Sequence, residues 1–173
     1  MNFDFKAYQA EAAKTAIYTD SLYPFASLLS EAVELADLYV KRDLRGDKKT
    51  ISRDEIISES GDVLWNLAAI CEDNKIEIED NFSEVINNFE TAEDDHVYLT
   101  KDLLVDACHT LKTLHNGHAS KLTMRIRAVM VLVRLGELLK TEGIHLAEVA
   151  EYNLAKLRSR QERGVLTGSG GNR

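Results

Sequence analysis

Proline and cysteine are both scarce in this sequence. Pro24 is the one proline among 173 residues, and alternating polar and apolar runs are almost absent, with only HVYLT at 96–100 fitting a short strand. Because proline interrupts helices and alternation marks strands, both absences predict an all-α fold. The two cysteines, Cys71 and Cys108, form no C-x-x-C pair. This disfavours a disulfide or a zinc site and predicts buried thiols in a reducing compartment.

Long hydrophobic runs are also missing. No stretch approaches the roughly 18 apolar residues of a membrane span. The opening MNFDFKAYQAEAA lacks the basic-then-apolar order of a signal peptide, so we expect a cytoplasmic protein without membrane association. The formal net charge of −8 argues against duplex nucleic acid or an anionic membrane as the main partner, because both are negatively charged. The partner should be a small molecule.

Helical periodicity dominates what is present. The length fits one domain spanning 1–173. Ser52 and Glu55 form an S-x-x-E capping box, which marks a helix start. Four of the nine glycines fall in GVLTGSGGNR at 164–173, which predicts a flexible tail that can bind phosphate. The expected helices are 4–18, 24–44, 52–74, 78–91, 98–115, 120–141 and 146–163.

Two acidic pairs interrupt the apolar faces of adjacent predicted helices. SEAVELAD contains Glu31 and Glu34, and SESGDVLW contains Glu59 and Asp62. At about 100° per residue, two residues three apart lie within about 60° of each other, and leucine, valine and isoleucine share that sector. If the two helices face each other, four carboxylates converge.

Converging carboxylates require a positive partner. At about 4 Å, two like charges repel by roughly 4 kcal/mol even at an effective dielectric of about 20. Mg²⁺, with Mn²⁺ as a possible substitute, is the suited cation, because it takes oxygen ligands and keeps waters that phosphates can replace. Two other interpretations stay open. The acids can be solvated charges on ordinary amphipathic helices, or a structural salt-bridge cluster that serves packing specificity.

These residues resemble the MazG-like all-α nucleoside triphosphate pyrophosphohydrolases, a family that includes relatives of the dimeric dUTPases. The family pattern of E-x-x-E, a gap and E-x-x-D reads EAVE at 31–34 and ESGD at 59–62. GDVLWNLAAI at 61–70 looks like the segment after the second pair, and EYNLAKLRSRQERGVLTGSGGNR at 151–173 resembles the C-terminal signature. One departure is Gly171, where such endings usually carry an aspartate. The resemblance covers about half of the chain.

The resemblance implies a MazG-like helical bundle that converts (deoxy)nucleoside triphosphates to monophosphates and pyrophosphate by water attack at the α-phosphorus. Glu31, Glu34, Glu59 and Asp62 would hold Mg²⁺, and Glu34 or Glu31 would orient or deprotonate the water. Basic groups would hold the outer face of the triphosphate. The candidates for substrate binding are Lys156, Asn153, Arg160, Arg163 and Arg173, with Asn66 and Trp65 for the base.

A long insertion separates the two parts that resemble the family. In single-domain members the asparagine–lysine segment follows the GDVLW helix after a short loop. Compared with itself, the chain aligns LLSEAVELAD at 28–37 with LLVDACHTLK at 103–112. We interpret this as a decayed tandem duplication with halves 20–95 and 96–163.

The two copies have lost complementary parts. The second copy sets Arg127 and Met130 where the first has Glu59 and Asp62, so it cannot hold a metal cluster. The asparagine–lysine segment occurs only in the second copy. The chain is then a single-chain pseudo-dimer with one surviving site, either self-sufficient or paired again as a homo-oligomer.

Two other function classes remain as alternatives. A non-catalytic helical adaptor would use the same fold for assembly and keep the acids as vestiges. A di-iron carboxylate oxidase is suggested by DACH at 106–109, which resembles half of an E-x-x-H signature, but such sites need two copies and further glutamates. Asp106 and His109 fall outside the apolar arc of their helix, which predicts a solvated face.

Overall fold

The described part of the chain is entirely helical. The computed structural model describes residues 3–45, 51–78, 95–115 and 119–165, and within these ranges it has helices and turns but no strand. The all-α prediction is confirmed. HVYLT, the one candidate strand, instead opens a helix at His96.

The observed helices follow the predicted ones closely. The largest difference is at the first helix, which ends at Ala13 where the sequence predicted residue 18. The predicted helix 78–91 lies almost wholly outside the described residues. The elements are α1 (Phe5–Ala13), α2 (Tyr23–Tyr39), the π-helix η1 (Val40–Leu44), α3 (Arg53–Asp73), α5 (His96–His115), α6 (Lys121–Thr141) and α7 (Leu146–Glu162).

Helix starts are set by local chemistry that the sequence displays. The capping box is present: the Glu55 amide donates to Ser52 Oγ over 3.1 Å, and the Ser52 amide donates to Glu55 Oε2 over 2.8 Å. Ser120 caps α6 by accepting a hydrogen bond from the Thr123 amide at its Oγ. Pro24 occupies the first turn of α2, where a missing N–H costs nothing.

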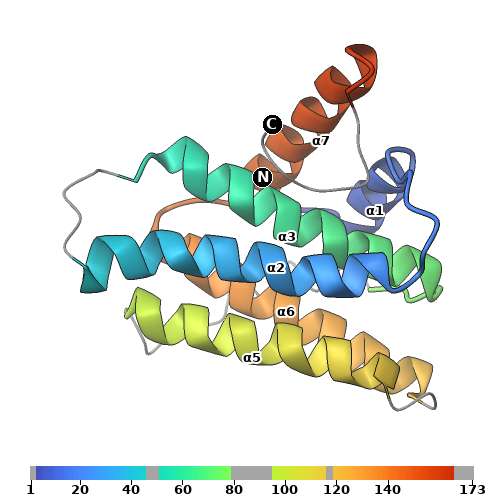
Figure 1. Ribbon diagram of the computed structural model, residues 1–173, viewed down its shortest axis with the longest axis horizontal. Helices are drawn as coiled ribbons and strands as arrows, with labels where there is room; N and C mark the ends of the chain where they lie inside the picture. The colour runs from blue at the N-terminus through green and yellow to red at the C-terminus, as the bar shows by residue number, and fades with distance from the viewer. Residues whose placement is uncertain (1–2, 46–50, 79–94, 116–118, 166–173) are drawn as a thin grey trace.

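Four long helices form the body of the molecule. α2 lies against α3 and α5, and α6 completes the ring by contacting the same two helices (Figure 1). Leucines fill the centre, each adding roughly 1.5–3 kcal/mol when fully buried. The leucines that are less than 2% exposed are Leu28, Leu35, Leu64, Leu67, Leu103, Leu132, Leu135, Leu138 and Leu139.

Two further helices cover α3 from outside the ring. α1 and α7 both pack on α3 and touch each other, while α7 projects beyond the bundle (Figure 1). This arrangement brings residues from the end of the chain to the helix that carries Glu59 and Asp62. Within the described residues, no helix combines the length and hydropathy that crossing a bilayer requires.

The two cysteines differ in exposure. Cys71 on α3 is buried, and burial raises the pKa of its thiol to about 12. Cys108 on α5 is exposed, so the prediction of a buried thiol is wrong at that position. Cys108 lies at the edge where α5 meets α2, and the apolar pattern of one helix does not reveal that this edge is open.

Candidate metal centre

Three acidic side chains from α2 and α3 converge. Glu31, Glu34 and Glu59 each offer a carboxylate oxygen, and these oxygens lie within 4.8 Å of one another. Glu31 is only 6% exposed, whereas Glu59 is half-buried and Glu34 is exposed. The cluster therefore runs from the core of the helix pair to its surface, so a ligand can reach it from solvent.

Burial and mutual repulsion disfavour the charged forms of these acids. Loss of hydration, followed by the nearby charges of Asp62, Glu34 and Glu59, raises the pKa of Glu31 to about 7. The pKa of Glu59 is also raised, first by burial and then by Asp62 and Glu34. A cation bound between the carboxylates would remove this penalty, since an opposite charge favours ionisation.

Asp62, the fourth predicted ligand, is held by a lysine from α7. Lys156 Nζ lies 2.8 Å from Asp62 Oδ1 and 2.7 Å from Oδ2, and it also contacts Ser58 Oγ at 3.2 Å. Asn153 Nδ2 approaches Asp62 Oδ1 at 3.4 Å. The structure thus places Lys156 and Asn153, predicted as substrate-binding residues, beside the acids.

The position of α7 depends on two residues that the sequence did not single out. Tyr8 of α1 donates a 2.9 Å hydrogen bond to Asn153 Oδ1, which fixes the amide so that its nitrogen faces Asp62. Gly61 lies against Asn153, and a Cβ at position 61 would come within 3.0 Å of Asn153 Cβ and Nδ2. No local signal marks Tyr8, because its partner is 145 residues away.

Trp65 and Asn66 lie on α3 beside the acids but are engaged in the protein. Trp65 donates through Nε1 to Thr15 Oγ1 over 2.9 Å, and its ring meets the Tyr18 ring edge-on at 6.0 Å. Asn66 is 2% exposed, and its Nδ2 donates to the carbonyl of Asp62. Asn66 Oδ1 is buried and accepts no hydrogen bond within the described residues. The Trp65 ring is half-buried and keeps some surface, whereas Asn66 keeps almost none.

The remaining predicted substrate-binding residues are basic. Arg160 is half-buried on α7. Arg163 caps the end of the same helix, is exposed, and donates from Nε to the carbonyl of Ser159. Arg173 and the glycines at 168, 170 and 171 lie outside the described residues. Lys156 therefore contacts one of the four predicted metal ligands, Asp62.

A second acidic cluster lies between α5 and α6. Asp106 is 8% exposed, so the prediction of a solvated face is wrong there. Arg134 of α6 covers it, with Nε 3.4 Å from Asp106 Oδ2 and Nη1 2.8 Å from Glu137 Oε2. His109 is half-buried and lies 3.4 Å from Arg127. A single-helix projection missed this because α5 packs against both α2 and α6 and so buries two faces.

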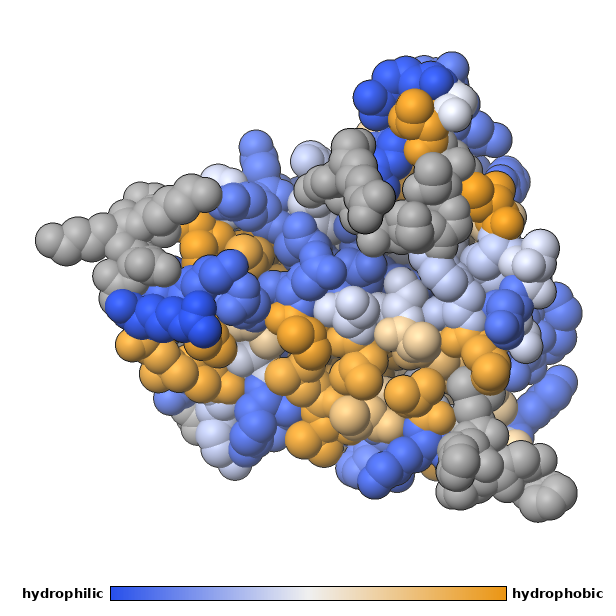
Figure 2. Space-filling model, in the orientation of Figure 1, coloured by the Kyte–Doolittle hydropathy of each residue, from blue (hydrophilic) through white to orange (hydrophobic). Residues whose placement is uncertain are grey.

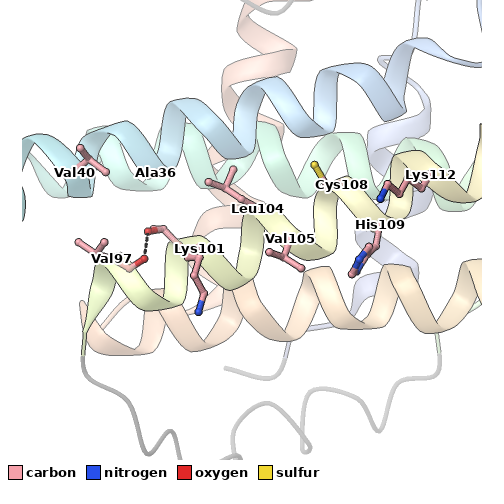
Figure 3. Close-up of a pocket in the computed structure, with 10 residues that line it drawn as sticks. Ala36, Val40, Val97, Lys101, Leu104, Val105, Cys108, His109 and Lys112 are labelled. Atoms are coloured by element: carbon pink, nitrogen blue, oxygen red, sulfur yellow. Dashed lines mark hydrogen bonds between the residues drawn. The ribbon is translucent and has the colours of Figure 1, made fainter.

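An apolar groove of about 470 Å³ lies along α2 and α5, and none of the four acids lines it. In Figure 3, Leu104 and Cys108 rise from α5 toward Ala36 of α2 and Val40 at the start of η1, which form the opposite wall. Figure 2 shows apolar surface gathered along these helices, with a more polar band over α3. The groove suits an apolar partner better than a triphosphate.

Comparisons with known proteins return no relative. No protein-family model matches the chain, and neither a curated protein nor a solved structure shows significant similarity to it. The functional argument therefore depends on the residues and their geometry.

The donor set suits a hard divalent cation. Three carboxylates on two helices supply only oxygen ligands, which Mg²⁺ and Mn²⁺ prefer, and the exposed Glu34 leaves one side open to water or phosphate. No histidine or cysteine belongs to this cluster among the described residues, so it lacks the ligands typical of zinc.

Proposed function

We propose that this chain is a Mg²⁺-dependent nucleoside triphosphate pyrophosphohydrolase of the MazG-like type. The observation that carries the proposal is the convergence of Glu31, Glu34 and Glu59 within 4.8 Å, next to an Asp62–Lys156 pair. A site with acids on one side and a lysine on the other matches the needs of a triphosphate, which carries about four negative charges. The reaction would yield a nucleoside monophosphate and pyrophosphate.

The chain's own residues divide the work between them. Glu31, Glu34, Glu59 and, once it is released by Lys156, Asp62 would hold the metal, which when bound neutralises phosphate charge and acidifies water. Glu34 is the exposed acid and would orient or deprotonate the attacking water. Lys156 would bind a phosphate oxygen, while Asn153 would keep α7 in place.

The buried acid supports this assignment over solvated surface charge. An ordinary amphipathic helix directs its carboxylates to water, whereas Glu31 is 6% exposed and has a pKa raised to about 7. Within the described residues no lysine or arginine forms a direct ion pair with Glu31, Glu34 or Glu59, and the charge of Lys156 offsets only part of the rise in the pKa of Glu31 and Glu59. A purely structural salt-bridge cluster would contain such a partner.

Pyrophosphate release tests the proposal. Canonical and modified nucleoside triphosphates are incubated with Mg²⁺ or with EDTA, and pyrophosphate is measured. We expect Mg²⁺-dependent release that Glu59→Gln lowers by at least about 100-fold, because even residues that only support metal ligands cost 10–100-fold. Asp54→Asn is the matched control, since Asp54 is exposed on the same helix, and it should keep full activity.

The main alternative is a non-catalytic adaptor, and the apolar groove between α2 and α5 is the observation that favours it. Absence of pyrophosphate release from every nucleotide tested would support this alternative. Equal release with Mg²⁺ and with EDTA would likewise contradict the metal-dependent mechanism.

A further inference from the structure

Lys156 contacts both carboxylate oxygens of Asp62, one of the predicted metal ligands. Its ammonium lies 2.8 Å from Oδ1 and 2.7 Å from Oδ2 of Asp62, and the lysine side chain is only 13% exposed. Ser58 supplies a further contact through Oγ at 3.2 Å. Within the part of the chain that the structure describes, Asp62 is the acid of the four that forms a direct ion pair with a basic side chain.

A metal ion and this ammonium cannot share the Asp62 carboxylate without strong repulsion. The other three acids lie within 4.8 Å of one another and form a ligand set that excludes Asp62. A divalent cation that enters the site alone would therefore meet three carboxylates and a nearby positive charge. Its affinity should be lower than four carboxylates would provide.

A triphosphate changes this balance. Its oxygens compete with Asp62 for Lys156, and the flexible four-carbon stem of a lysine lets the ammonium move while the backbone stays in place. Asn153 holds α7 independently, because it accepts from Tyr8 and packs on Gly61. Lys156 can thus leave Asp62 without α7 leaving α3.

We propose that Lys156 is a positioning residue that couples metal binding to triphosphate binding at this site. Without triphosphate, the Lys156 ammonium keeps Asp62 from binding the metal. When the ammonium moves to a phosphate oxygen, Asp62 becomes available as a fourth carboxylate ligand. Each ligand then strengthens binding of the other by the same factor. The inference rests on the proposed function, because it assigns the regulation of that same site.

Mn²⁺ binding without phosphate is the first test, measured by electron paramagnetic resonance of the free ion. Lys156→Met should tighten Mn²⁺ binding at least tenfold, because it frees Asp62. The double variant Asp62→Asn/Lys156→Met keeps the net charge of the wild type and should bind within about twofold of it. Arg158→Met, which removes a positive charge from an exposed position of α7, controls for simple electrostatics and should change little.

Lysine NMR gives a second, direct readout. In protein labelled at lysine Cε, the Lys156 signal is assigned by its loss in Lys156→Met. Mg²⁺ alone should leave this signal in place, whereas Mg²⁺ with inorganic tripolyphosphate should shift it. A shift with Mg²⁺ alone would overturn the proposal, because the metal would then displace the lysine unaided.

The outcomes separate this inference from the proposed function. If Lys156→Met binds Mn²⁺ no more tightly than the wild type while nucleotides still release pyrophosphate, the coupling is refuted and the enzyme stands. If Glu59→Gln binds Mn²⁺ as well as the wild type and no nucleotide is hydrolysed, the metal site itself is refuted.

Discussion

The helix pairs α2–α3 and α5–α6 differ in the charged groups that face their buried acids. Between α5 and α6, the Arg134 guanidinium lies between Asp106 and Glu137, at 3.4 Å and 2.8 Å. Between α2 and α3, Glu31 and Glu59 face other carboxylates, and within the described residues the direct ion pair with a basic side chain is made by the neighbouring Asp62. One pair contains its counter-charge, and the other must obtain most of it from outside.

A buried acid by itself therefore does not indicate a ligand site. Asp106 and Glu137 are as buried as Glu31, yet their arginine makes them a structural cluster. What distinguishes α2–α3 is that, within the described residues, Glu31 and Glu59 form no direct ion pair, and burial together with the neighbouring carboxylates raises the pKa of both.

Removing the Arg134 guanidinium from between α5 and α6 should have the largest effect on stability. Arg134→Met leaves two buried carboxylates without their partner, and we expect about 3 kcal/mol lower free energy of unfolding in urea. Arg158→Met removes an arginine from an exposed pair with Glu11 and should give no measurable change. Equal effects of the two variants would mean that burial does not distinguish these ion pairs.

Removing a charged group from between α2 and α3 should instead raise the free energy of unfolding. Glu31→Gln relieves burial and repulsion of an anion whose pKa is raised to about 7, so the metal-free protein should gain on the order of 2–3 kcal/mol at pH 8. Glu151→Gln, at an exposed position of α7, is the control and should be neutral. Destabilisation by Glu31→Gln would show that Glu31 already has a partner.

The pH dependence of stability follows from the same group. Unfolded Glu31 loses its proton near pH 4.5, whereas folded Glu31 keeps it until about pH 7. The contribution of Glu31 therefore falls as pH rises from about 4.5 to 7 and is constant above that range. Thermal unfolding of the metal-free protein across this range should show a decline that is smaller in Glu31→Gln.

Added Mg²⁺ should stabilise the protein through α2–α3. At ten times the dissociation constant, binding contributes about 1.4 kcal/mol, which for a chain of this size raises Tm by roughly 3–6 °C. Glu59→Gln should lose most of this increase, whereas Asp54→Asn should keep it. A rise that persists in Glu59→Gln would place the binding elsewhere.

The smallest expected effect is a difference in reactivity between the two cysteine thiols. Cys108 on α5 is exposed and should react with a thiol reagent in the folded protein, while Cys71 on α3 should react only after unfolding. Quantifying free thiols before and after adding denaturant measures this. Reaction of both in the folded state would indicate that α3 opens locally.

Helix positions could be predicted from the sequence, but the functional contacts mostly could not. Capping at Ser52 and helical spacing at Glu31, Glu34 and Glu59 are local properties, and the structure retains them. The early end of α1 depends on Thr15, whose hydroxyl donates to Ala12 and accepts from a tryptophan 50 residues away. Such a contact leaves no trace in local periodicity.

The lysine–aspartate pair illustrates the same limit at the site. Lys156 was expected to bind substrate and Asp62 to bind metal, each from its own segment. Their direct contact depends on α7 packing against α3, which Tyr8 and Gly61 make possible. Likewise, Arg134 could be found only once α6 was known to lie beside α5.

The separation of Asp62 and Lys156 also has a consequence during synthesis. The two residues are 94 positions apart, and a ribosome adds about 5–20 residues per second. For roughly 5–19 seconds after Asp62 is translated, its carboxylate exists without the lysine that later joins it. During that interval Lys156 cannot neutralise Asp62, so the carboxylate can pair with ions of the surrounding solution before it pairs with Lys156.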